Sequence, residues 1–493
     1  MDGGPVDDKV QDVLGQSRNP GASRSSYASE TCCRSSEQYV DVSGGTSEMA
    51  DRMNGTTLPG GALAQLKRFA RSRDAVREAG VELALSLDEQ WSTARVAETG
   101  PVDVVDMFAG CGGMSAGFLA ANALLPAYRL ATAIDIDDVA MKTYEANLGL
   151  KPLRLDLNAY SESQEGLVQI VNAARRAPNA PLVLIGCAPC QGFSSHRNAA
   201  GEADLRNTLF VTFARAAIAI RPDVVVVENV PEVATDRYWP VVAEARRVLE
   251  SGGYEVVLTA HDMADFGVPQ HRYRAVMVGM RRPFKMPRGF LTGELRRTVR
   301  QAIEFLPSIA PGEVCASDGM HYTAGHKSST VETIKAVPLD GGRRPFDVGP
   351  ESLRRYAERT GELAFKDVYS RLWWDRPAIT ITGHARNPAS GRYVHPEQHR
   401  GLSVREAALL QGFPKSWTFA GGLSSAFLQV GNAVPPPFAT FLAVHILGEL
   451  FGEPAEVTDR EMDISGSLGS TFSRRIPALK AGRQAAHEPM AAR

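Results

Sequence analysis

The chain has 493 residues and a formal net charge of −2; 44% of its residues are hydrophobic and 22% are charged. This is the composition of an ordinary soluble globular protein with room for two domains, and it excludes a bulk basic signature of nucleic-acid binding. We expect no secretory signal, no membrane span, and six free thiols in a reducing cytosol.

The predicted elements begin after a polar N-terminal tail. Residues 1–58 are rich in Ser, Gly and Asp without periodicity, and we predict that they are disordered. Residues 59–100 are predicted to form a helical extension, with Leu63 and Leu66 on an apolar face and Arg68 on a basic one. The basic face could touch DNA phosphates, but a helix packed on the main domain is the simpler interpretation.

Strands and helices alternate from residue 101 onward. Five β-branched runs are predicted to be buried strands, at residues 102–108, 129–135, 180–186, 222–229 and 273–280. Helical stretches separate most of them. This alternation predicts an α/β fold, a Rossmann-like, mostly parallel sheet with helices on both faces, over residues 101–283.

The alternation ends after Met280. Residues 284–395 are irregular and rich in Gly, Pro and Arg, and they are predicted to form a smaller inserted domain. Residues 396–452 regain a packed character and are expected to complete the main domain. Residues 453–493 are predicted to be a disordered tail.

A glycine-rich turn follows the first predicted strand, in "DMFAGCGGMSAGF" at residues 106–118. Its glycines allow tight turning and close backbone approach to a ligand at a helix N-terminus. It is neither a dinucleotide-binding G-x-G-x-x-G nor a P-loop, so it is weak evidence alone. The candidate cofactor contacts in this turn are Phe108, Gly110, Cys111, Gly112 and Gly113.

Acidic residues lie at the end of the second predicted strand and at a further strand end in "RLDLN" (154–158). Asp135 lies roughly twenty residues further on, where such folds place an acid on ribose hydroxyls, and Ile136 would lie against an adenine. Asp156 is placed to accept a hydrogen bond from the adenine amino group, with Leu157 beside it. Either acid alone could simply cap a helix, but three such strand ends together favour a cofactor site.

The turn "GCAPCQGFSS" at residues 186–195 holds Cys187 and Cys190. A C-x-x-C redox pair would start a helix, whereas this turn is long and irregular. A zinc site would need four ligands, and no second C-x-x-C or His pair lies nearby, so no metal is predicted. In the remaining interpretation Cys187 is buried at the strand end and Cys190, after Pro189, projects as a nucleophile.

Six motifs in chain order resemble those of the cytosine-C5 DNA methyltransferases. They are "FAGCGG", "PCQGFS", "VENV" (227–230), "QHRYR" (270–274), "REAALLQGFP" (405–414) and "QVGNAVPP" (429–436). The resemblance covers residues 101–450 and leaves both tails unmatched. It implies DNA (cytosine-5-)-methyltransferase activity, S-adenosyl-L-methionine as cofactor and double-stranded DNA as partner.

The chemistry of that family explains these residue types. Carbon 5 of cytosine is a poor nucleophile until a thiolate adds at carbon 6 and leaves an enamine. The resemblance assigns the thiolate to Cys190. It implies that the carboxyl of Glu228 hydrogen-bonds or protonates ring nitrogen 3, and a dry pocket would raise the pKa of that carboxyl. It implies that Arg272 is the cation that holds the pyrimidine carbonyl, with Arg274 behind it. A strand-end acid paired structurally with an arginine is the alternative for Glu228.

The last two motifs have different expected roles. The resemblance implies that Asn432 contacts the cofactor, with Ala433 packing nearby. In the helical motif at residues 405–414, Arg405 and Glu406 are expected to brace the small domain rather than to touch substrate.

Nine Arg or Lys and a single acid, Glu294, lie between Gln270 and Arg300. This local basic patch leads into the small domain and could bind phosphates, although a solvated arginine-rich surface is the alternative. A cytosine inside a duplex is shielded, so the base must flip into the Cys190 pocket.

Two other functions remain open from the sequence. An RNA-directed relative would carry a C-F-T run, but the small domain holds only Cys315. A catalytically silent DNA-binding protein would not need the complete set of motifs. We expect a monomeric, cytoplasmic, nucleoid-associated bacterial enzyme, either an orphan methylase or one of a restriction-modification system.

Overall fold

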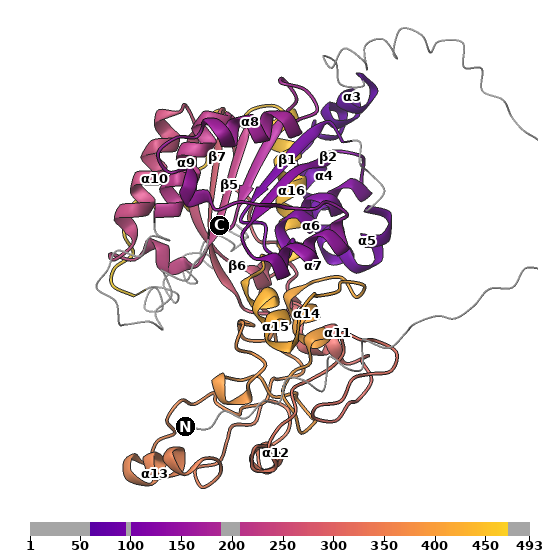
Figure 1. Cartoon of the computed structure of the whole chain (residues 1–493), viewed down its shortest axis with the longest axis vertical. Helices are drawn as coiled ribbons and strands as arrows, with labels where there is room; N and C mark the ends of the chain where they lie inside the picture. Colours follow the sequence, from indigo (N-terminus) through magenta and orange to yellow (C-terminus); the bar gives the residue numbers. More distant parts are fainter. Residues whose placement is uncertain (1–59, 95–99, 189–207, 472–493) are drawn as a thin grey trace, which may run out of the picture. The chain divides into compact units, whose positions relative to one another are not determined.

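The computed structural model describes residues 60–94, 100–188 and 208–471. Their centre is a seven-stranded sheet in the order β3-β2-β1-β4-β5-β7-β6 (Figure 1). The strands are β1 (Val102–Met107), β2 (Tyr128–Asp135), β3 (Leu153–Arg154), β4 (Leu182–Gly186), β5 (Val224–Asn229), β6 (Glu255–Asp262) and β7 (Tyr273–Met280). The first five pair in parallel, and β7 runs antiparallel to β5 and β6. The predicted Rossmann-like sheet is confirmed, and β6 is a strand that the sequence did not reveal.

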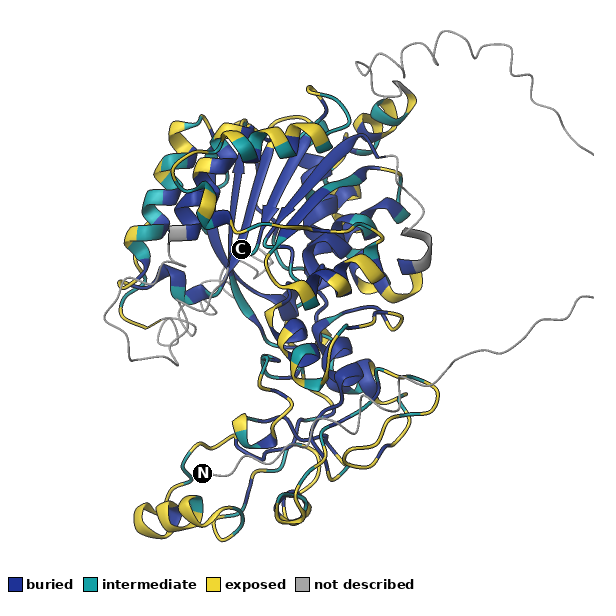
Figure 2. Cartoon of the chain, in the orientation of Figure 1, coloured by how far each residue is buried: buried dark blue, intermediate teal, exposed yellow. Residues whose placement is uncertain are grey.

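Helices cover both faces of the sheet, which explains why the strands are nearly continuous apolar runs (Figure 2). Val104 of β1 packs in one apolar cluster with α4, α6 and α16, whereas Val105 packs in another with α8, α9 and α10. The helix bounds are α4 (Arg73–Leu85), α6 (Gly113–Ala120), α7 (Asp138–Leu148), α8 (Glu165–Ala174), α9 (Thr208–Ile220), α10 (Trp239–Ser251) and α16 (Pro436–Phe451).

The N-terminal extension packs on this core as predicted. It consists of α3 (Gly60–Phe69), α4 and α5 (Leu87–Ala94). Helix α4 lies so close to α16 that a Cβ at Gly80 would be 3.1 Å from the ring of Phe441. Leu66 is fully buried, while Lys67 and Arg68 are exposed. Trp91 of α5 contacts the ring of Trp417 at a centroid distance of 5.5 Å.

Within the described residues, one stretch is long and apolar enough to cross a membrane, namely Leu423–Phe451. It comprises α15 (Leu423–Asn432) and α16, and 83% of its most apolar window is buried inside the fold. From the sequence we expect no apolar run of this length, and that expectation is wrong for length and composition alone. The burial is that of a pair of core helices.

Buried arginines organise the irregular small domain, whose helices are α11 (Val299–Ile303), α12 (Ser328–Lys335) and α13 (Glu351–Thr360). Arg371, Arg392 and Arg400 are fully buried. The guanidinium of Arg371 donates to the backbone carbonyls of Ile334, Val337, His395 and Gln398. Since buried carbonyls need donors, these side chains replace the hydrogen bonds that a sheet ladder would provide.

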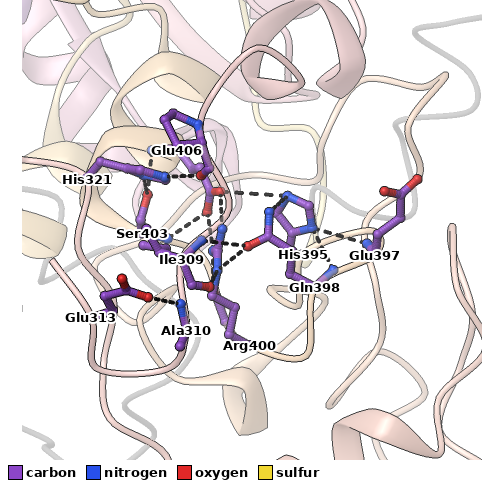
Figure 3. A network of polar contacts seen from close by, with 12 residues as sticks. Ile309, Ala310, Glu313, His321, His395, Glu397, Gln398, Arg400, Ser403 and Glu406 are labelled. Atoms are coloured by element: carbon purple, nitrogen blue, oxygen red, sulfur yellow. Dashed lines mark hydrogen bonds and ion pairs between the residues drawn. The ribbon is translucent and has the colours of Figure 1, made fainter. Parts of the chain in front are cut away.

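A buried ion pair fastens the small domain to α14 (Val404–Gln411) (Figure 3). Glu406 accepts from both terminal nitrogens of Arg400, at 2.8 and 2.7 Å, and Ser403 and Glu406 form a capping box. Nδ1 of His395 accepts two backbone N–H groups, so its proton lies on Nε2, 3.7 Å from the Glu406 carboxylate. Arg405 pairs with Asp318. The bracing role expected for Arg405 and Glu406 is confirmed.

Replacing Glu406 with glutamine should destabilise the protein at neutral pH by about 3–5 kcal/mol, because it leaves Arg400 buried without its counter-charge. The pKa of Glu406 is lowered to about 2 by Arg400, and burial lowers the pKa of His395 to about 4. The unfolded chain therefore takes up these protons first as pH falls. Wild-type stability should drop from about pH 6.5 downward, and the drop contributed by Glu406 should vanish in the variant.

Urea unfolding followed from pH 8 to pH 2 measures both effects, because the His395 contribution is lost between about pH 6.5 and 4 and the Glu406 contribution between about pH 4.5 and 2. Glu351→Gln is the matched control, because Glu351 pairs with Arg355 on the exposed side of α13. An exposed pair of this kind contributes at most about 1 kcal/mol. Equal destabilisation by the two substitutions would contradict the bracing role of Glu406.

The segment after Gly452 differs from the predicted disordered tail. Residues 453–471 are described, and they pack along β6 and α10. Asp463 pairs with Arg246 at 2.8 Å and accepts from the backbone N–H of Leu258. The backbone N–H of Ile464 donates to the Leu258 carbonyl at 2.7 Å. Polar composition concealed this packing, because the contacts are mainly charged and backbone groups.

Candidate active site

A cavity of about 450 Å³ opens at the carboxyl ends of β1, β2, β4 and β5. This is the edge where open α/β sheets bind ligands, and the size suits a small-molecule cofactor. Of the predicted site residues that the structure describes, all but Gly112 line it. They are Phe108, Gly110, Cys111, Gly113, Asp135, Ile136, Asp156, Leu157, Glu228, Arg272, Arg274, Asn432 and Ala433.

The glycine loop is shaped by backbone conformation and close packing. Gly112 has a φ of 91° and caps the N-terminus of α6, so its role is conformational rather than that of a wall residue. A Cβ at Gly113 would lie 2.3 Å from the carbonyl oxygen of Val434, so only glycine lets the C-terminal segment seat there. Burial raises the pKa of Cys111 to about 12, so its thiol is a poor nucleophile.

The two predicted acids hold different positions. Asp135 accepts from the backbone N–H of Gly110 at 2.7 Å, which joins the glycine loop to the end of β2. The N-cap of α7 is Asp137, so the capping alternative does not apply to Asp135. Asp156 does cap a short helix, η2 (Leu157–Tyr160), and also lines the cavity. Ile136 is 59% exposed on the cavity wall, as expected for a side chain that packs on a ring.

Glu228 lies at the end of β5 with 5% of its surface exposed. Residue pairing between β5 and β7 sets Glu228 opposite Val276, which brings Arg274 diagonally beside it. Arg274 Nε lies 2.9 Å from Glu228 Oε1, without hydrogen-bond alignment. Burial raises the pKa of Glu228, and Arg274 and then Arg272 oppose the shift. The carboxyl therefore keeps its proton to a higher pH than an ordinary glutamate does.

The two arginines of the "QHRYR" motif hold different positions in the structure. Arg272 is 1% exposed and donates to the carbonyl oxygens of Ile381, Gly431 and Ala433. It joins the small domain to the end of α15. Arg274, rather than Arg272, is the cation beside Glu228, and the spacing in "QHRYR" could not reveal which arginine pairs with the acid.

Cys187 is the only one of the two turn cysteines that the structure describes. Burial and the nearby carboxylate of Glu228 raise its pKa well above the ordinary value. A thiol held in this state is a poor nucleophile. Cys190 lies outside the described residues, two positions after Ala188. Asn229 donates from Nδ2 to the Ala188 carbonyl at 3.1 Å. Sequence reasoning missed this positioning contact, and its place beside Glu228 in "VENV" was the available signal.

Asn432 ends α15 and is exposed on the cavity wall. The carbonyl groups of its neighbours Gly431 and Ala433 accept from Arg272, so the segment is fixed on both sides of Asn432. In the described ranges, no cluster of three or more His, Cys, Asp or Glu could hold a metal ion.

The basic run between Gln270 and Arg300 is largely neutralised in the fold. Arg296 pairs with Asp265 at 2.6 Å, Arg300 pairs with Asp375 at 2.7 Å, and Arg288 pairs with Asp459 at 3.0 Å. The guanidinium of Arg282 donates to backbone carbonyls. These residues serve the packing of the chain, so the hypothesis of one phosphate-binding patch is not supported.

Comparisons with known proteins agree with this geometry. The family model of the C-5 cytosine-specific DNA methylases matches residues 102–448. The chain is 32% identical over 351 residues to the Type II methylase M.HgiDII of Herpetosiphon aurantiacus, covering 70% of this chain and 94% of that protein. It is 32% identical over 350 residues to the Type II methyltransferase M1.HphI of Haemophilus parahaemolyticus, covering 70% and 86%. The crystal structure of a prophage-encoded DNA modification methyltransferase (E. coli) shares the fold, with a TM-score of 0.50, 23% identity and coverage of 71% and 99%.

Proposed function

Because the chain belongs to the C-5 cytosine-specific DNA methylase family and is a DNA cytosine-5-methyltransferase, we propose a specific course for its reaction. The methyl group comes from S-adenosyl-L-methionine and goes to carbon 5 of a cytosine flipped out of a specific duplex sequence. Cys190 forms a covalent adduct with the base during the transfer.

The cavity has the donor set that this cofactor needs. The carboxylates of Asp135 and Asp156 suit ribose hydroxyls and an adenine amino group, and exposed Ile136 offers an apolar surface to the ring. The open space above Gly110, where a Cβ would meet nothing within 4 Å, leaves the loop backbone accessible. Asn432 would hold the methionine end. When bound, the cofactor supplies an electrophilic methyl group.

The buried pair of Glu228 and Arg274 carries the proposal for the base. The Cys190 thiolate adds to carbon 6, and the proton of Glu228 moves to ring nitrogen 3 as negative charge develops there. Arg274, 2.9 Å from the carboxyl, holds Glu228 in place and can reach the pyrimidine carbonyl. After methylation, the carbon 5 proton leaves to solvent, the thiolate is expelled, and the nitrogen 3 proton returns to Glu228, which restores the aromatic ring and the enzyme.

The cellular setting follows from the relatives as part of the proposal. The similar proteins are Type II methylases, which supports an enzyme that acts on DNA in the cytoplasm with the nucleoid; we propose that it acts as a monomer. It acts as an orphan methylase or beside a restriction enzyme. Residues 284–395 select the target sequence, because the cofactor and base contacts lie outside them.

Expression in a methylation-free host followed by sequencing for modified bases tests the activity. We expect 5-methylcytosine at one short recurring sequence, and none in cells that express Cys190→Ala. Methylation of RNA alone, or of an exocyclic amino group, would contradict the proposal.

A further inference from the structure

Phe365 combines two unusual properties. Its side chain is 79% exposed, the largest exposed fraction among the large hydrophobic residues that the structure describes. Its backbone has a φ of 52°, in the left-handed region that bulky residues rarely adopt. An exposed aromatic ring and a strained backbone both lower the stability of the fold. A residue that combines them is therefore a candidate for a functional role.

The turn around Phe365 is rigidly tied although its ring is free. The carbonyl of Phe365 accepts from Val368 at 3.0 Å, and Ser370 donates to the carbonyls of Lys366 and Asp367. The Asp367 carboxylate pairs with the buried guanidinium of Arg392 at 3.0 Å. The ring is therefore presented by a preformed support rather than by a loose loop.

Backbone contacts connect this turn to the rim of the active-site cavity. The N–H of Tyr369 donates to the Pro388 carbonyl at 2.8 Å. Pro388 belongs to the loop that begins at Gly383, and a Cβ at Gly431 would lie 2.1 Å from the Gly383 nitrogen. Gly431 and Leu428 line the cavity. Contacts through the loop at residues 383–388 thus link the Phe365 turn to the residues that line the cavity.

We propose that Phe365 inserts into the DNA duplex at the target and stacks on the bases that remain when the cytosine leaves. This inference rests on the proposed function and assigns a positioning residue to it. Apolar side chains that enter base steps lower the cost of unstacking, and a rigid support lets the ring enter without further ordering.

The test compares two duplexes that carry the target sequence found by methylation sequencing. One is fully paired, and the other has an abasic site opposite the target cytosine, so that no base pair must be broken. Phe365→Ala should lower kcat/KM on the paired duplex by about 10–100-fold, the range expected for loss of one aromatic stacking contact. On the abasic duplex the loss should shrink to within about threefold, because the cost of extrusion is already reduced.

Two further variants and one spectroscopic signal separate the possible explanations. Phe365→Asn tolerates the left-handed backbone and should match Phe365→Ala, whereas Phe365→Trp should retain activity. Phe305→Ala is the matched control, because Phe305 is 54% exposed but lies under the Lys415 ammonium, 4.4 Å from the ring centroid. The fluorescence rise of 2-aminopurine at the target position should be weaker with Phe365→Ala than with wild type.

Equal loss on both duplexes would show an ordinary DNA contact and overturn the insertion role, as would full activity of Phe365→Ala. If wild-type protein methylates no cytosine, the proposed function fails instead. The 2-aminopurine signal of wild type would still report whether a base is extruded.

Discussion

Cys190→Ala is expected to abolish methyl transfer while leaving the affinity for S-adenosyl-L-methionine nearly unchanged. The proposed cofactor contacts lie on the glycine loop, at the ends of β2 and β3, and in the Asn432 segment, all of which line the cavity and none of which contains this thiol. Without a thiolate, carbon 5 stays too weak a nucleophile to attack the methyl group. Radiolabelled methyl transfer to target duplex measures the first effect, and calorimetric titration with the cofactor measures the second.

Cys187→Ala is the matched control for this experiment. Burial and neighbouring carboxylates keep the Cys187 thiol protonated, and it packs with the apolar cluster of β1, β4 and β5. Its loss should cost a little stability and leave most of the activity. If the two variants were equally inactive, a function for the cysteine pair would replace the single nucleophile.

Glu228→Gln should slow the reaction by roughly 10²–10⁴-fold, the usual contribution of a positioned acid to proton transfer. The amide keeps the shape of the side chain and cannot give up the required proton. Burial raises the pKa of Glu228, so its acid form persists to a higher pH than that of an ordinary glutamate and is lost as pH rises through that pKa. The wild-type rate should therefore fall at high pH, and this descending limb should be absent from the variant.

Duplex DNA with 5-fluorocytosine at the target measures the same step directly. Thiolate addition and methyl transfer can proceed, but fluorine cannot leave carbon 5 as a cation, so the adduct is trapped. The complex should survive denaturing electrophoresis and map by peptide mass to the segment with Cys190. It should form far more slowly with Glu228→Gln. An adduct at another cysteine would overturn the assignment of the nucleophile.

The sequence predicted the cavity well because its residues belong to short, continuous motifs at strand ends. Asp135 and Glu228 directly follow apolar runs, and parallel strands bring such ends to one edge. The different contacts of Arg272, which donates to backbone carbonyls, and Arg274, which pairs with Glu228, could not be predicted in this way. It depends on how β7 pairs with β5 and on which carbonyls of residues 381–433 come within reach.

Long-range pairing also explains the other differences. The run of β6 is apolar, but only its pairing with β7 makes it a strand of this sheet. The tail around Asp463 is polar because its partners are Arg246 and the backbone of β6. A composition rule cannot distinguish such a segment from a solvated one. Three arginines of the basic run pair with Asp265, Asp375 and Asp459, which lie outside the run, so the run itself does not show how far its charge is neutralised.

The tail that packs along β6 also affects whether molecules of this enzyme aggregate. β6 is an edge strand, and an eight-residue edge with free backbone groups invites another chain to add a strand. Here the N–H and carbonyl of Leu258 bind residues 463–464, and the Val256 carbonyl accepts from Arg246 and Arg460. Shortening the protein to the family core of residues 102–448 would expose this edge, so the tail protects the solubility of a chain whose net charge of −2 offers little mutual repulsion.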